Sequence, residues 1–291
     1  MLTKSLLLVL TLALLAGLSI APVAGSAPAT RASLHAASAA SFSDAAGDSG
    51  AAADVTDVDV GNDLVAGHIV FWVTVPNRPD NLVAGDEIAL FIDSDNNQST
   101  GDLGAEYLIV LDSEGVSLYR WDAAQYVGID PASLKAEFSK PDKAFRVAIH
   151  PRDLGIAGAF NFSIETTTGE AHDFAPNGPP DWAYTLATGR VGLGVSGSAL
   201  APKRPSAGKA LAAVMVIVRN DINEVLTQGK VACTLKVGTT SIPATRAGFV
   251  SGVAVCSWKL AKSAKGKLVR GTISVTFGGT TVKRSFSARA R

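Results

Sequence analysis

The stretch Ile88-Ala89-Leu90-Phe91-Ile92-Asp93-Ser94-Asp95-Asn96-Asn97-Gln98-Ser99-Thr100-Gly101-Asp102-Leu103-Gly104-Ala105-Glu106-Tyr107-Leu108-Ile109-Val110-Leu111 decides the fold class. It places a loop rich in oxygen ligands between two apolar runs that are typical of β-strands. Carboxylates and amides with no cationic side chain among them either face water or hold a hard cation such as calcium. We expect a β-domain with calcium bound at Asp93, Asp95, Asn97, Asp102 and Glu106. A solvated turn with Asx hydrogen bonds is the alternative.

Short alternating runs continue on both sides of this loop. Ile69, Phe71 and Val73 share one face of a strand, and Phe160, Phe162 and Ile164 share one face of another. Only Pro151-Arg152-Asp153-Leu154 has the pattern of a helical turn. Spacing of this kind predicts an all-β chain made of antiparallel sandwiches.

The start of the chain has the pattern of an export signal. Lys4 precedes the uncharged apolar run from Ser5 to Ile20, and small residues suited to cleavage follow it. We expect a signal peptide over residues 1–27, an exported protein and no membrane span after cleavage. Residues 28–43 are mostly Ala, Ser, Thr and Pro, which predicts a flexible spacer.

The net charge of zero conceals an uneven distribution. Residues 28–200 contain 24 Asp and Glu against 9 Lys and Arg, whereas residues 201–291 contain 2 against 16. Together with the Pro- and Gly-containing segment 197–208, this asymmetry predicts two domains, 44–196 and 209–291, joined by a linker. The two halves either attract each other, or the basic half contacts an anionic cell-wall polymer. In the second case the best candidates are Lys262, Lys265 and Lys267, which cluster in one connection.

The second domain alternates as cleanly as the first. Cys233 lies on the apolar face of one run, and Cys256 lies with Trp258 on the apolar face of another. An even cysteine count in an exported chain predicts a disulfide between Cys233 and Cys256. Gly278-Gly279 predicts a two-residue hairpin turn.

The chain lacks the signatures of common catalytic sites. No nucleophile elbow, phosphate loop or dinucleotide fingerprint occurs, and the histidines have no metal-site spacing. We therefore expect a non-catalytic protein, with a polysaccharide hydrolase that uses an acid pair as a further alternative. Nucleic acid is not expected as a partner, because no aromatic residue interleaves the basic cluster. Trp72 and Trp121, with Trp182 and Tyr184, are candidates for a flat surface that stacks on sugars, or else they belong to the core.

Several motifs of the first domain together carry a family resemblance. They are Asp44-Ala45-Ala46-Gly47-Asp48 before Asp54-Val55, Phe91 to Asn97 with Thr100-Gly101-Asp102, Ala105 to Ile109, and Asp173 to Asn177 ahead of Trp182 and Tyr184. This segment resembles the family 9-like carbohydrate-binding sandwich of secreted bacterial proteins, which is related to DOMON domains. The resemblance implies a jelly-roll-like sandwich, often with calcium, that binds sugars or serves as an accessory module.

The second domain resembles bacterial immunoglobulin-like domains through Cys233 and the Cys256-x-Trp258 pattern. The leading hypothesis is therefore a secreted binding protein of the cell envelope that is stabilised by calcium and carries a carbohydrate-binding-like domain. The alternative is a purely structural or adhesive surface protein.

Overall fold

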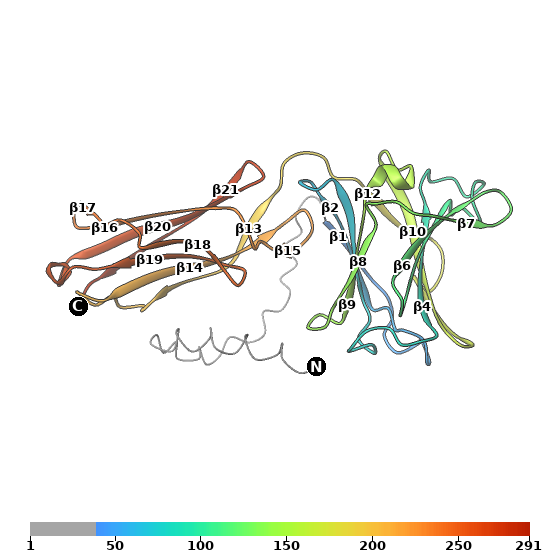
Figure 1. Ribbon diagram of the computed structural model, residues 1–291, viewed down its shortest axis with the longest axis horizontal. Coiled ribbons are helices and arrows are strands. Elements are labelled where there is room, and N and C mark those ends of the chain that lie inside the picture. Colours follow the sequence, from blue (N-terminus) through green and yellow to red (C-terminus); the bar gives the residue numbers. More distant parts are fainter. Residues whose placement is uncertain (1–38) are drawn as a thin grey trace, which may run out of the picture. The chain divides into compact units, whose positions relative to one another are not determined.

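The protein is all-β, as the alternation predicts. The computed structural model describes residues 39–291, in which the regular structure consists of antiparallel strands and short 3-10 turns (Figure 1). The predicted signal peptide and residues 28–38 of the predicted spacer lie outside the described residues. No helix in the described part of the chain is long and apolar enough to cross a membrane.

The first sandwich pairs a five-stranded sheet with a seven-stranded sheet. The five-stranded sheet has the order β1 (Ala39–Ser43), β2 (Asp57–Asp63), β3 (His68–Thr74), β9 (Ala144–Ile149) and β8 (Lys135–Ser139). The seven-stranded sheet has the order β11 (Ala171–Ala175), β10 (Ala159–Thr168), β4 (Asp86–Asp93), β5 (Tyr107–Asp112), β6 (Val116–Trp121) and β7 (Tyr126–Ile129), and β12 (Trp182–Thr185) also pairs with β10. The predicted helical turn is a 3-10 turn at Pro151–Leu154.

The core of this sandwich lies between its two sheets. Phe71 of β3 contacts Phe160 and Phe162 of β10 edge to face, with ring centroids 6.1 and 5.5 Å apart. All three side chains are fully buried. The predicted inward faces are therefore confirmed, and large aromatic side chains supply much of the buried area.

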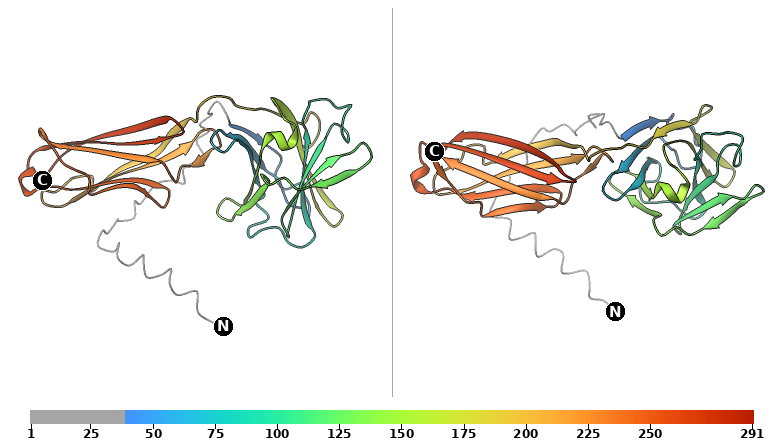
Figure 2. Two further views of the ribbon diagram at one scale, coloured as in Figure 1. Left: turned by 45° about the horizontal axis from the view of Figure 1, so that its top comes forward. Right: turned by 90° about the horizontal axis from the view of Figure 1, so that it is seen from above.

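The second sandwich has a four-stranded sheet opposite a five-stranded sheet (Figure 2). One sheet has the order β13 (Leu193–Ala201), β14 (Ala210–Arg219), β19 (Val253–Lys259) and β18 (Arg246–Val250), with β15 (Glu224–Val225) also on β14. The other has the order β17 (Thr240–Ser241), β16 (Lys230–Val237), β20 (Leu268–Phe277) and β21 (Thr280–Arg289). The turn between β20 and β21 contains Gly278 and Gly279 at φ 53° and 79°, as a two-residue hairpin requires.

The predicted disulfide is present. Cys233 of β16 and Cys256 of β19 are bonded, with Cα atoms 5.7 Å apart, and the bond joins the two sheets. Trp258, on the same face of β19 as Cys256, is 1% exposed in the same core. Val214, Val216 and Val218 lie on the outer face of β14, because Leu211, Met215 and Ile217 occupy the core.

Two predicted boundaries are wrong. The end of the predicted spacer forms β1, and its Phe42 packs on Phe162 and Trp182 with centroids 5.2 and 5.4 Å apart. The start of the predicted linker belongs to β13, which pairs with β14 through a bulge between Val195 and Gly197. Cross-strand hydrogen bonds thus order segments whose small side chains resemble a linker in sequence.

Candidate functional site

The Asp93 loop brings three carboxylates together. Asp93 ends β4, Glu106 immediately precedes β5, and Asp95 lies in the connection between these strands. One carboxylate oxygen of each of these residues lies within 4.8 Å of the others. Asp93 is buried and Asp95 is exposed, so the group opens to solvent at one side.

Glu106 holds this group in place and leaves one oxygen unused. Its Oε2 accepts hydrogen bonds from the Ser94 backbone N–H at 2.8 Å and the Ser94 hydroxyl at 3.0 Å. Its Oε1 is buried and has no hydrogen-bond partner among the described residues. A buried carboxylate oxygen without a partner is unfavourable, and a bound cation would satisfy it.

Asn97 and Asp102, the other predicted ligands, are placed differently. The side-chain oxygen of Asn97 accepts a hydrogen bond from the Ser99 backbone N–H at 3.1 Å. The backbone N–H of Asn97 donates to the carboxylates of Asp93, at 3.1 Å, and Asp95, at 2.9 Å. Asp102 forms a backbone bridge with Ala105 and lies outside the carboxylate group. The loop thus brings three of the five predicted ligands together, and it also contains the Asx hydrogen bonds expected of a solvated turn.

Gly101 allows this loop to close tightly. Its φ is 65°, and a Cβ at this position would lie 2.3 Å from the Ala105 carbonyl oxygen. Burial, followed by the charges of Asp102 and Glu106, raises the pKa of Tyr126 to about 12. The charges of Asp102 and Glu106 thus act on the first residue of β7 in the same direction as burial.

Two residues at the site are far from the loop in sequence. Asn161 is the register partner of Asp93, and its amide nitrogen lies 3.2 Å from Asp93 Oδ2. Burial, followed by the charge of Asp93, raises the pKa of Asp181. No local pattern in the sequence indicates either residue, because the pairing of β10 with β4 and β12 brings them there.

A second acidic group lies near the start of the sandwich. Asp44, Asp48 and Asp173 have carboxylate oxygens within 4.8 Å of one another, whereas Asp54 accepts from the Gly47 N–H at 3.0 and 3.1 Å. The Asn177 amide donates to Asp44 and to Asp48, the latter at 2.7 Å. Burial raises the pKa of Asp173, and the charges of Asp48, Asp44 and Asp54 act in the same direction.

The aromatic residues do not form one sugar platform. Trp72 lies on β3 and Trp121 on β6, which belong to opposite sheets of the sandwich. Tyr184 is 4% exposed, and Trp182 packs on Phe42 and Phe162. Trp121 contacts Tyr126 edge to face, with centroids 5.2 Å apart.

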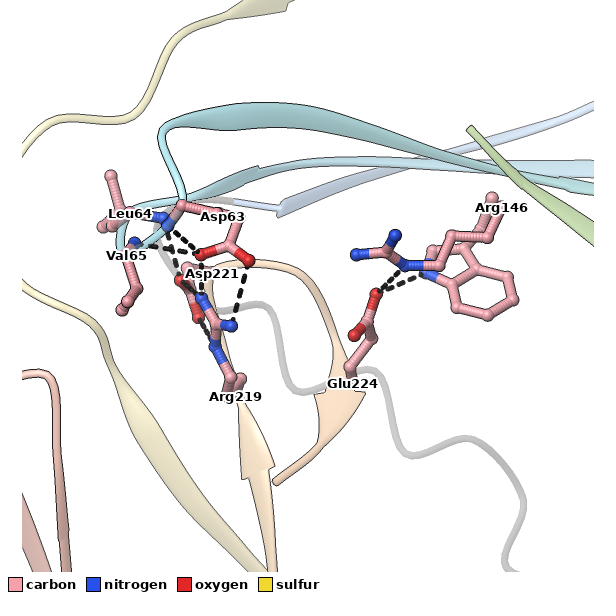
Figure 3. A network of polar contacts seen from close by, with 9 residues as sticks. Asp63, Leu64, Val65, Arg146, Arg219, Asp221 and Glu224 are labelled. Carbon is pink, nitrogen blue, oxygen red and sulfur yellow. Dashed lines mark hydrogen bonds and ion pairs between the residues drawn. The ribbon is translucent and has the colours of Figure 1, made fainter. Parts of the chain in front are cut away.

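Trp72 instead belongs to a polar joint between the two sandwiches. Its indole N–H donates to Glu224 at 3.2 Å, and Arg146 donates to the same oxygen at 2.6 Å (Figure 3). In the same joint, the Arg219 guanidinium lies between Asp63 of the first sandwich and Asp221 of the second (Figure 3). No local pattern in the sequence predicts this network, because its residues come from segments far apart in the chain.

The predicted basic connection lies at one end of the second sandwich. Lys262 begins a 3-10 turn that ends at Ala264, and Lys265 and Lys267 follow it. All three side chains are exposed. None of them forms an ion pair within the described residues, so each is free to meet an anion.

Comparisons with known proteins give structural likeness only. No family model matches the chain, and no curated relative matches it. A fragment of the titin I-band, I67–I69, is 12% identical with a TM-score of 0.25, and the match covers 77% of this chain and 59% of that one. The D00-D0 domain of intimin is 11% identical with a TM-score of 0.27, and the match covers 56% of this chain and 89% of that one. At these values we transfer no function from either protein.

Proposed function

We propose that the chain is an exported, non-catalytic adhesive or structural protein whose first sandwich is stabilised by calcium at Asp93, Asp95 and Glu106. Export is supported by the apolar start of the sequence and by the Cys233–Cys256 disulfide, which is typical of oxidising compartments. The resemblance of the Asp93 loop to the family 9-like sandwich also favours calcium.

The buried Glu106 Oε1 is the observation that carries this proposal. Three carboxylates in close proximity repel one another in the absence of a cation, and calcium prefers oxygen ligands of this kind. As an extracellular site it would have a Kd of roughly 10⁻⁴–10⁻³ M. A cation there would tie the end of β4 to the start of β5.

Calcium titration of Glu106→Gln tests the proposal. At about ten times Kd, calcium should stabilise the wild type by about 1.4 kcal/mol and raise its Tm by roughly 3–6 °C. Glu106→Gln should lose this response. In EDTA the variant should melt no lower than the wild type, because the substitution removes one of three mutually repelling charges, including the Oε1 that has no partner among the described residues.

Glu114→Gln is the matched control, since Glu114 is an exposed acid in the turn between β5 and β6. It should keep the full calcium response. A wild type whose calorimetric Tm is the same in calcium and in EDTA would overturn the proposal.

Sugar binding is the alternative proposal, and it rests on the family resemblance and on Trp121. The joint occupies Trp72, so Trp121 with its neighbour Tyr126 is the remaining aromatic pair for a sugar face. Retention of the full chain on a neutral polysaccharide, abolished by Trp121→Ala with an unchanged Tm, would support this alternative over a purely structural role.

A further inference from the structure

The second sandwich has an outer sheet face whose charges are all positive. The whole second sandwich contains two acidic residues, Asp221 and Glu224, and both form ion pairs at the joint with the first sandwich. Asp221 is fully buried against Arg219, and Glu224 accepts from Arg146 and Trp72 (Figure 3). The remaining 15 of its 16 basic residues therefore have no acidic side chain within the sandwich to neutralise them.

Part of this excess charge lies on the outer face of the β16-β20-β21 sheet. Strand alternation points one set of side chains away from the core, and the basic members are all exposed. These basic members are Lys230, Lys236, Arg270, Lys283 and Arg289. We call this surface the basic sheet face.

Lys236 and Arg270 are register partners on adjacent strands of this face. Like charges directly opposite each other destabilise an antiparallel pair. No carboxylate on this face offsets the repulsion. The repulsion between Lys236 and Arg270 lowers the stability of the free protein. An anion bound across both side chains would neutralise them and remove that repulsion.

Hydroxyl groups fill the area between the cations. Thr234, Thr272 and Ser285 form one row across the three strands, and Thr276 pairs with Thr281 in a parallel row. The Thr272 and Ser285 hydroxyls lie 3.0 Å apart, and those of Thr276 and Thr281 lie 2.8 Å apart. Lys230 and Lys236, six residues apart on β16, span about 20 Å.

We propose that the basic sheet face binds a linear acidic polysaccharide. Such a polymer alternates carboxylates, which suit the cations, with hydroxyls, which suit the Ser and Thr rows. The outward positions of this face hold no aromatic side chain for stacking on nucleic-acid bases and no large apolar anchor for a lipid surface beyond Leu268 at its edge. This proposal does not depend on the calcium site.

Binding of the full chain to carboxymethyl dextran, with unmodified dextran as the neutral reference, tests the proposal. Lys236→Thr/Arg270→Thr/Lys283→Thr should bind carboxymethyl dextran about tenfold more weakly, because each exposed ion pair contributes a factor of about two. The Tm of this variant should not fall, since the opposed pair of like charges is removed and Thr suits a strand. Arg270→Thr alone should weaken binding in the same direction.

Lys209→Thr/Arg246→Thr/Lys259→Thr is the matched control, because it removes the same charge from exposed positions outside both the basic sheet face and the Lys262–Lys267 connection. It should bind within about twofold of the wild type. An equal loss in both triple variants would show a diffuse effect of net charge and overturn the proposal, and so would a larger loss in the control. Wild-type binding to phosphatidylglycerol vesicles or duplex DNA, without binding to carboxymethyl dextran, would overturn it as well.

Discussion

Asp86, at the start of β4, is a buried carboxylate that a single arginine neutralises. Arg78 donates to both of its oxygens, at 2.6 and 2.8 Å, and the Thr168 hydroxyl donates at 2.6 Å. Burial alone would raise the pKa of Asp86, but these hydrogen bonds outweigh it and lower the pKa from 3.8 to about 2. The folded state therefore favours the charged form.

This shift predicts an acid-sensitive contribution to stability. Because the folded pKa lies below the unfolded one, the stabilisation is present above about pH 4 and is lost as the pH falls towards 2. Its size is on the order of 2 kcal/mol. Urea unfolding across this range should show that loss in the wild type and a much smaller pH dependence in Asp86→Asn, which should be less stable at pH 7.

Asp80→Asn controls for general charge effects. Asp80 pairs with Lys140, but both side chains are about three-quarters exposed, at 74% and 73%. An exposed pair contributes little, so this variant should follow the wild type at every pH. Matching curves for Asp86→Asn and the wild type would contradict the role given to Arg78.

The disulfide contributes at the scale of elements, because it ties β16 of one sheet to β19 of the other. It closes a sequence separation of 23 residues, which corresponds to about 3 kcal/mol in the chain-entropy model. Cys233→Ala/Cys256→Ala should lose roughly that amount of unfolding free energy, measured by urea unfolding.

A direct control is available for this prediction. Reductant should lower the stability of the wild type towards that of the double variant and leave the variant unchanged. Equal stability of the oxidised wild type and the variant would show that sheet packing alone holds the second sandwich together.

Alternation predicted the elements well where side chains differ strongly between the two faces. β3 and β10 are examples, since large apolar residues recur at every second position. It failed for β1 and β13, whose Ala, Ser and Gly residues carry little hydrophobic signal. The same limit applies to the site, where Glu106 was predicted from local spacing and Asn161 was not, because strand pairing across 68 residues brings Asn161 to Asp93.

At the scale of the whole molecule, the charge split was visible in the sequence but the joint was not. Arg219 and Asp63 are 156 residues apart, and only the fold brings them together. Asp63, Arg219 and Asp221 are 8, 8 and 0% exposed, so the joint buries three charges. The uneven charge distribution led to two expectations: attraction between the acidic and basic halves, or contact of the basic half with an anionic polymer. The ion pairs of the joint show attraction between the halves, but they involve only a few of the charges.

The joint also fits closely in shape. Ile222 is 2% exposed and packs with Val70 and Ala148 of the first sandwich. At Gly61 a Cβ would lie 2.4 Å from the Asp221 carbonyl oxygen, so only glycine allows the backbones to approach this closely. Burial of both apolar and charged groups predicts that the two sandwiches unfold together.

Arg219→Met tests this coupling, because it leaves the carboxylates of Asp63 and Asp221 buried without their cation. Loss of one partner from a buried ion pair costs about 3–5 kcal/mol. We expect the single calorimetric transition of the wild type to separate into two, one for each sandwich. Arg284→Met, at an exposed position, should leave one transition.

Asp63→Asn/Arg219→Met/Asp221→Asn removes all three charges, so it should recover much of the lost stability while the transitions stay apart. That result would assign the coupling to the ion network, whereas a single transition in the triple variant would assign it to the packing of Ile222 on Val70 and Ala148.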